Sequence, residues 1–134
     1  MKPSFVDTDI LSQFLRNNLT VVSNANKYLQ AYNVINFSII IYYEVLNGLL
    51  YKDAKNQLAA FIEFTELNRV LPLTMRSAEI AAEIYADLRK EGKPIGHTDS
   101  LIAGIALANG LQLVTNNTEH FKRVKNLVLV NWLK

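Results

Sequence analysis

Three carboxylates stand out in this sequence because each one ends, interrupts or precedes a run of apolar residues. Asp7 follows the apolar run that begins at Phe5, Glu44 is the only charge in IIIYYEVLNGLL, and Asp99 precedes the long uncharged stretch SLIAGIALANG. A buried carboxylate without a partner costs free energy, and no Lys or Arg lies nearby in the sequence to pair with any of the three. A shared divalent cation would compensate all of them, and Mg²⁺ and Mn²⁺ prefer carboxylate oxygens.

Each of these acids also has an ordinary structural interpretation. Asp7 could cap the helix that follows it, because Asp is a favoured N-cap residue. Asp99 could interact with a helix dipole from the first turn, and Glu44 could simply face solvent. Gly48, one turn after Glu44, could allow close packing of its helix or be a tolerated helix glycine. The spacing therefore predicts a metal site only if the fold brings the acids together.

The elements that must position these residues alternate along the chain. Short apolar runs predict strands at residues 3–7, 34–38, 69–73, 111–115 and 127–132, and helical patterns fill the segments between them. This order predicts an α/β fold with a short parallel sheet of about five strands, flanked by helices on both faces. Ligands of such sheets bind at the carboxyl ends of the strands, where Asp7 and the segment Thr115–Asn117 are expected.

Composition narrows the class of protein. The 134 residues predict one domain over 1–134, and a hydrophobic fraction of 50% argues against disorder. The absence of cysteine excludes disulfides and thiolate metal sites, which leaves oxygen ligands or His97 and His120. We recognise no signal peptide and no apolar run of the roughly 18 residues that span a membrane, so a cytoplasmic location is expected. A net charge of +2 is too small to predict nucleic-acid binding by itself.

Four stretches, in this order, resemble the PIN-domain ribonucleases, and among them the VapC-like toxins of toxin–antitoxin pairs. FVDTDIL resembles the opening strand with a first metal-binding aspartate, here Asp7. FSIIIYYEVLNGL is similar to the segment that carries a glutamate, here Glu44, and GKPIGHTDSLIAGIALANG resembles the segment with a second metal-binding aspartate, here Asp99. LQLVTNNTEHFKRV resembles the strand and turn that complete the acidic cluster. The resemblance covers essentially the whole chain.

The resemblance implies a PIN-like three-layer sandwich and a Mg²⁺- or Mn²⁺-dependent endoribonuclease. Such an enzyme would cleave structured RNA such as tRNA by metal-activated water, and it would form a homodimer neutralised by a small antitoxin. Asp7 and Asp99 would bind the metal, and Glu44 would orient the attacking water or act as base. Supporting groups would be Thr8, Asp9, Thr115, Asn117 and Glu119.

The last stretch departs from the family pattern. Many relatives carry an aspartate where Asn117 stands, or an acid where His120 stands, and Glu119 is one position away. The fourth acidic ligand could therefore be replaced by Asn117, supplied by Glu119, or be missing. Basic residues around this stretch are expected to form a cationic rim for RNA, although helix ends favour such residues anyway: Lys90, Lys93, Lys122, Arg123 and Lys125.

Two other functions remain open at this stage. The non-acidic Asn117 and His120 also fit a degenerate PIN-like module that binds RNA or a partner without cleaving. The motif DTDIL resembles the nucleophile motif of haloacid-dehalogenase-type phosphatases, which need a later lysine and a downstream acidic pair, whereas Asp99 stands alone.

Overall fold

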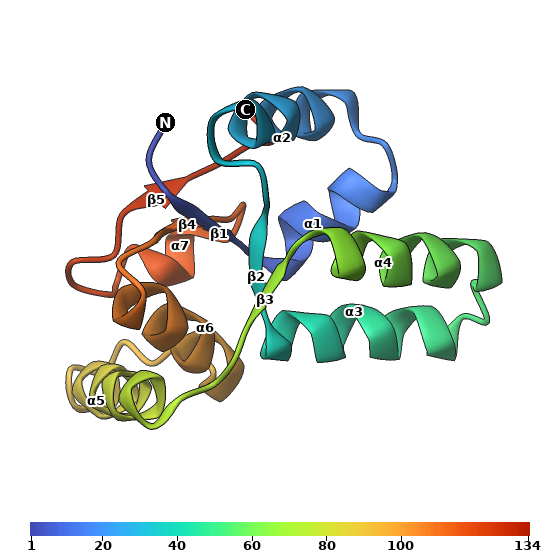
Figure 1. Cartoon of the computed structure of the whole chain (residues 1–134). Helices are drawn as coiled ribbons and strands as arrows, with labels where there is room; N and C mark the ends of the chain where they lie inside the picture. Colours follow the sequence, from blue (N-terminus) through green and yellow to red (C-terminus); the bar gives the residue numbers. More distant parts are fainter.

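The computed structural model describes residues 1–134, and its centre is one parallel five-stranded sheet (Figure 1). The strands are β1 (Ser4–Val6), β2 (Asn36–Ser38), β3 (Arg69–Leu71), β4 (Gln112–Val114) and β5 (Leu129–Val130). Their order across the sheet is β3-β2-β1-β4-β5, with every neighbouring pair parallel. The predicted α/β fold is confirmed. Because β1 lies in the middle, the residue that follows it is surrounded by the ends of its neighbours.

Seven helices join and cover the strands: α1 (Thr8–Leu15), α2 (Leu19–Tyr32), α3 (Ile39–Tyr51), α4 (Lys55–Leu67), α5 (Met75–Lys90), α6 (His97–Ala108) and α7 (Thr118–Phe121). Helix α2 lies on one side of the sheet and the α5–α6 pair on the other, while α3 and α4 form a hairpin of helices beside the β3 edge (Figure 1). None of these helices is both long and apolar enough to cross a membrane.

The core is built from apolar side chains of the central strands and the helices packed on them. Phe5, Phe37 and Leu113 of three adjacent strands are fully buried, as are Phe61 of α4 and Ile105 of α6. Burial of such side chains contributes about 1.5–3 kcal/mol each to folding. Helix α6 is buried along most of its length, as its all-round apolar sequence predicts.

Two helix glycines differ in what surrounds them. A Cβ atom placed on Gly104 of α6 would lie 2.5 Å from the carbonyl oxygen of Ser77 and 2.8 Å from Cβ of Ala81, so α5 and α6 pack backbone to backbone there. A Cβ on Gly48 of α3 would meet no atom within 4 Å. The close-packing interpretation of Gly48 is therefore wrong, and Gly104 has that role instead.

The C-terminal segment is less regular than its sequence predicts. The strand expected over residues 127–132 is limited to Leu129–Val130, and the helix expected over residues 117–124 ends at Phe121. Trp132 leaves the sheet to pack on Tyr28, with ring centroids 5.7 Å apart, and its carbonyl accepts a hydrogen bond of 2.9 Å from Nδ2 of Asn24. These contacts with α2 replace the ladder that a longer strand would make.

Candidate active site at the carboxyl edge of the sheet

Asp7 lies where β1 meets α1, at the carboxyl edge of the sheet. Its backbone N–H continues the ladder to Val114 of β4, and its side chain caps α1 by accepting a hydrogen bond of 2.8 Å from the N–H of Thr8 on Oδ1. The hydroxyl of Thr115 donates to Oδ2 at 2.8 Å. The capping interpretation is therefore correct, and it coexists with an unusual environment, because the side chain is buried.

Burial dominates the electrostatics of Asp7. The pKa of its carboxyl is raised from 3.8 to about 7, mainly by desolvation and to a smaller extent by the negative charges of Asp9 and Asp99, against the opposing effect of the hydrogen bonds from Thr115 and Thr8. A raised pKa means that the site opposes a negative charge at this carboxyl. A cation beside Asp7 would reverse that penalty.

Asp9 connects the start of α1 to the loop after β4. Its Oδ1 accepts a hydrogen bond of 2.8 Å from the N–H of Ile10, and its Oδ2 accepts one of 3.0 Å from the N–H of Asn116. Burial raises its pKa, and these backbone bonds oppose that rise. Asn131 in turn donates to the amide oxygen of Asn116 at 2.9 Å. Asn116 lies in the segment that the sequence placed at this edge, whereas Asn131 was missed, because its role depends on contacts between distant segments.

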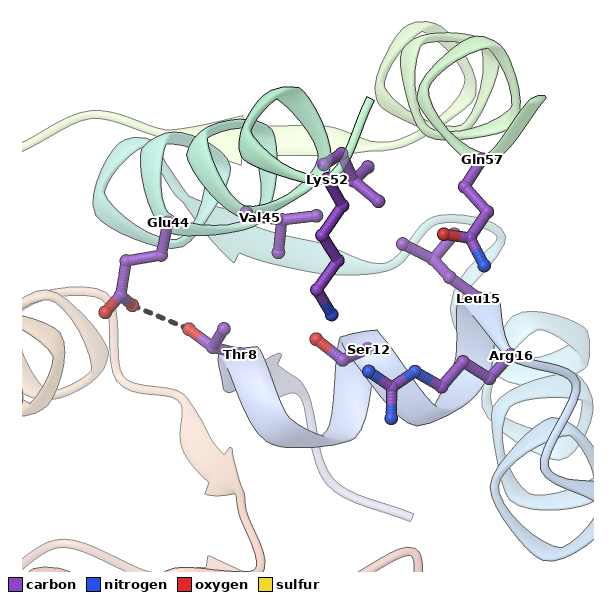
Figure 2. A pocket seen from close by; sticks show the side chains of 10 residues that line it. Thr8, Ser12, Leu15, Arg16, Glu44, Val45, Lys52 and Gln57 are labelled. Carbon is purple, nitrogen blue, oxygen red and sulfur yellow. Dashed lines mark hydrogen bonds between the residues drawn. The ribbon is translucent and has the colours of Figure 1, made fainter. Parts of the chain in front are cut away.

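Glu44 joins the site from α3. The hydroxyl of Thr8 donates a hydrogen bond of 2.7 Å to its Oε1, which connects α1 with α3 (Figure 2). Glu44 is exposed, as its ordinary interpretation expects, yet it lies at the same edge as Asp7. One carboxylate oxygen is thus held by Thr8.

Asp99 lies in the first turn of α6 and faces the loop after β4. Nδ1 of His120 is 3.6 Å from its Oδ2, and Nδ2 of Asn117 is 3.2 Å from the same His120 nitrogen. The N–H of Asn117 bonds to Oγ1 of Thr115 at 3.0 Å. Polar contacts therefore connect Asp99 with Asp7 through these three residues. The resemblance placed His120 where relatives carry an acid, and its contact with Asp99 is the part that the sequence did not indicate.

The other predicted residues lie outside this network. Glu119 is paired with Lys122 at 2.7 Å, and that lysine lowers its pKa. Arg123 donates a hydrogen bond of 3.0 Å from Nη1 to the carbonyl of Pro94, which ties α7 to the loop before α6. Lys90 and Lys93 are exposed. No three acidic or histidine side chains lie close enough together to enclose a metal ion by themselves.

Comparison with known proteins identifies the family. The model of the PIN domain matches residues 4–127. The chain belongs to the PIN-domain family. Within it, the chain is 30% identical over 130 residues to ribonuclease VapC2 of Rickettsia felis, covering 96% of this chain and 97% of that protein. It is 31% identical over 131 residues to the tRNA(fMet)-specific endonuclease VapC of Shigella flexneri, covering 92% and 99%. It is thus a PIN domain of the VapC type.

Solved structures agree with this membership. The crystal structure of VapBC2 from Rickettsia felis bound to a DNA fragment from its promoter matches with a TM-score of 0.87 at 27% identity, over 96% of this chain and 98% of that one. DNA-bound VapBC from Salmonella typhimurium matches with a TM-score of 0.88 at 27% identity, over 98% and 99%. The predicted PIN-like sandwich is confirmed, and the haloacid-dehalogenase-type family is excluded.

Proposed function

We propose that this PIN domain is the ribonuclease toxin of a toxin–antitoxin pair and that it cleaves structured RNA such as tRNA with Mg²⁺ or Mn²⁺. The observation that carries the proposal is the position of Asp7. Its carboxyl lies at the carboxyl edge of a parallel sheet, where burial and, to a smaller extent, the charges of Asp9 and Asp99 raise its pKa. The VapC relatives named as a ribonuclease and as a tRNA(fMet)-specific endonuclease support the same reaction class.

The donor set fits a hard divalent cation. Mg²⁺ usually keeps several waters and binds through one or two carboxylates plus substrate phosphates, so it needs no cage of three acids. Asp7 and Asp99 supply such carboxylates, and a cation near both would offset the free-energy penalty that burial places on the ionised form of Asp7. When bound, the cation would polarise the scissile phosphate and make a water more acidic.

The chain's own residues would orient the reaction. Glu44, held by Thr8 through one oxygen, has its second oxygen available to orient the attacking water or accept its proton. Thr115 and the N–H of Thr8 hold Asp7 in one orientation. Asp9 holds the loop after β4 against α1 through Asn116.

The position of the missing acid would be filled by Asn117 and His120. His120 lies beside Asp99, and Asn117 contacts His120. Together they would orient the Asp99 carboxylate. We assign Glu119 no contact with the cation, because its carboxylate forms an ion pair with Lys122.

RNA and protein partners complete the proposal. The exposed side chains of Lys90, Lys93 and Lys122 would bind phosphates, which predicts salt-dependent affinity. The similar structures are of VapBC complexes, so we also propose a small antitoxin as partner. The homodimer and the cytoplasmic location stay predictions.

Cleavage of total tRNA by the purified protein tests the proposal, in Mg²⁺, in Mn²⁺ and in EDTA. Asp99→Asn should abolish a cleavage that also requires the cation, whereas Asp87→Asn on the solvent face of α5 should not. Absence of cleavage by the unaltered protein in every condition contradicts the ribonuclease. Retained RNA binding in that case would support the non-cleaving module.

A further inference from the structure

A groove leads away from the acidic edge between α1 and α3. It encloses a cavity of about 110 Å³ whose lining includes Thr8, Ser12, Arg16, Glu44 and Lys52. Since one water takes up roughly 30 Å³ in the liquid, this space suits a few waters or one group of phosphate size. The groove shares Thr8 and Glu44 with the candidate active site, so a chain lying in it would reach that site directly.

Six of the ten residues that line the groove form two matching rows, and Leu15, Val45, Leu49 and Gln57 complete the lining. On α1 the row is Thr8, Ser12 and Arg16, and on α3 it is Glu44, Gly48 and Lys52, each at a spacing of four. Residues four apart lie on one face of a helix, so each row faces the groove along its whole length. The rows join at Thr8 and Glu44 through the hydrogen bond of 2.7 Å.

The groove changes character from its acidic to its basic end. Figure 2 shows the ammonium of Lys52 and the guanidinium of Arg16 both directed toward the hydroxyl of Ser12. The ion pairs of the chain are His120 with Asp99 and Lys122 with Glu119, so neither cation is paired with a carboxylate. Two unpaired cations that line one cavity repel each other, and an anion between them would relieve that repulsion.

Gly48 keeps the middle of the groove open. No atom lies within 4 Å of where its Cβ would stand, and its backbone is not in the left-handed region, so neither packing nor conformation requires glycine there. Glycine in a helix costs about 1 kcal/mol relative to alanine. The side of the groove formed by α3 is therefore open at this position, and only a side chain larger than alanine would fill it.

We propose that this groove is a phosphate-binding subsite, in which Arg16 and Lys52 hold the RNA backbone on one side of the scissile bond. The inference rests on the proposed ribonuclease function. Eight residues of helix span about 12 Å at roughly 1.5 Å per residue. A stacked strand covers that distance in about three to four nucleotides at roughly 3.4 Å each. The bound strand therefore extends along α1 and α3 as well as toward the predicted rim of Lys90, Lys93 and Lys122.

Arg16 and Lys52 also have an alternative role, because basic residues are favoured at the C-terminal ends of helices. Arg16 is the C-cap residue of α1 and Lys52 is that of α3, where positive charge interacts favourably with the helix dipole. A capping role would affect folding stability, but it would leave RNA affinity and its salt dependence unchanged. The experiment therefore measures RNA binding.

Fluorescence anisotropy with labelled tRNA, in EDTA and at several salt concentrations, measures this affinity in the non-cleaving Asp99→Asn background. Arg16→Gln or Lys52→Gln should each raise Kd roughly tenfold near 0.1 M salt, and the double variant should lower the slope of log K against log salt by about 1.5. The charge-matched control is Lys27→Gln with Lys134→Gln, two exposed residues that do not line the groove. Equal effects of the two double variants would overturn the proposal.

Substitution of Gly48 tests the groove without changing the net charge of the protein. Gly48→Ala and Gly48→Leu should both raise Tm by about 3 °C, because each removes a helix glycine. Gly48→Leu places a side chain in the groove and should weaken tRNA binding more than tenfold, whereas Gly48→Ala should change it less than twofold. An unchanged tRNA affinity of the Gly48→Leu variant would contradict the proposal.

The two proposals can fail separately. Metal-dependent cleavage by the unaltered protein, with tRNA affinity that does not depend on Arg16 and Lys52, would keep the ribonuclease and remove the subsite. An anionic protein segment would then be the better occupant of the groove. Affinity that depends on both cations, without cleavage in any condition, would keep the subsite and remove the ribonuclease.

Discussion

The hydroxyl of Thr115 donates a hydrogen bond of 2.8 Å to Oδ2 of Asp7, although 108 residues separate the two in the sequence. The same hydroxyl oxygen accepts the N–H of Asn117 at 3.0 Å. One buried side chain therefore connects the end of β1 with the loop after β4, and it orients the carboxyl on which the proposed site is centred.

Replacing Thr115 tests that connection. Thr115→Val keeps the shape of the side chain but removes the donor to Asp7 and the acceptor for Asn117, which leaves buried polar groups unsatisfied. We expect the free energy of unfolding to fall by about 1–3 kcal/mol in urea denaturation. Thr118→Val, which removes a hydroxyl that does not bond to Asp7, is the control and should have a smaller effect. Equal losses for the two variants would contradict the role of Thr115.

The raised pKa of Asp7 predicts an unusual pH dependence of stability in EDTA. The folded state holds the Asp7 proton up to about pH 7, while the unfolded chain releases it near 3.8. Between these values the folded state binds more protons, so its stability is highest below pH 4 and falls as pH rises through 7, by an amount on the order of a few kcal/mol. Other groups add their own dependence, so the informative quantity is the difference from a variant.

Asp7→Asn isolates the contribution of this carboxyl. Asparagine cannot ionise, so the variant should be more stable than the unaltered protein at pH 8 and should lose that advantage progressively as the pH falls to 4. Urea denaturation of both proteins across this range measures the difference. A difference that does not change with pH would show that Asp7 ionises with an ordinary pKa.

The contact between α5 and α6 predicts opposite effects at two helix glycines. Gly104→Ala would force a methyl group against the carbonyl of Ser77 and the side chain of Ala81, so we expect a loss of about 1–3 kcal/mol in the free energy of unfolding. Gly48→Ala should instead gain up to about 1 kcal/mol. Thermal unfolding of the two variants measures the contrast, and a destabilised Gly48→Ala would mean that α3 has a close neighbour there.

Substitutions at two neighbouring residues, His120 and Glu119, test which of them takes the place of the family's fourth acidic residue. His120→Ala removes the group 3.6 Å from Asp99, and we expect tRNA cleavage to fall about tenfold or more because that carboxylate loses its orientation. Glu119→Gln removes only the exposed pairing with Lys122, so cleavage should stay within about twofold. The reverse order of effects would assign the fourth position to Glu119.

Part of the candidate site could be predicted because an acid at the end, in the middle or at the start of an apolar run is visible in the sequence. Asp7, Glu44 and Asp99 were found in this way, and the parallel sheet places the first of them where such folds bind ligands. The contacts of His120 and Asn116 were not predicted, since polar residues in a polar turn carry no such signal. Glu119 was placed beside the acids by its position in the chain, but its side chain turns to Lys122.

The sequence by itself determined the order and type of the elements, because backbone preference and the period of apolar residues are set by neighbours in the chain. It also determined which strand ends carry acids. Only the tertiary structure decided which side chains meet, such as Thr8 with Glu44 and His120 with Asp99. These meetings depend on strand order and on how each helix is rotated about its axis, and both are decided by packing of the whole core. Packing of the helices also decides that the space beside Gly48 is open and that Gly104 lies against the neighbouring helix.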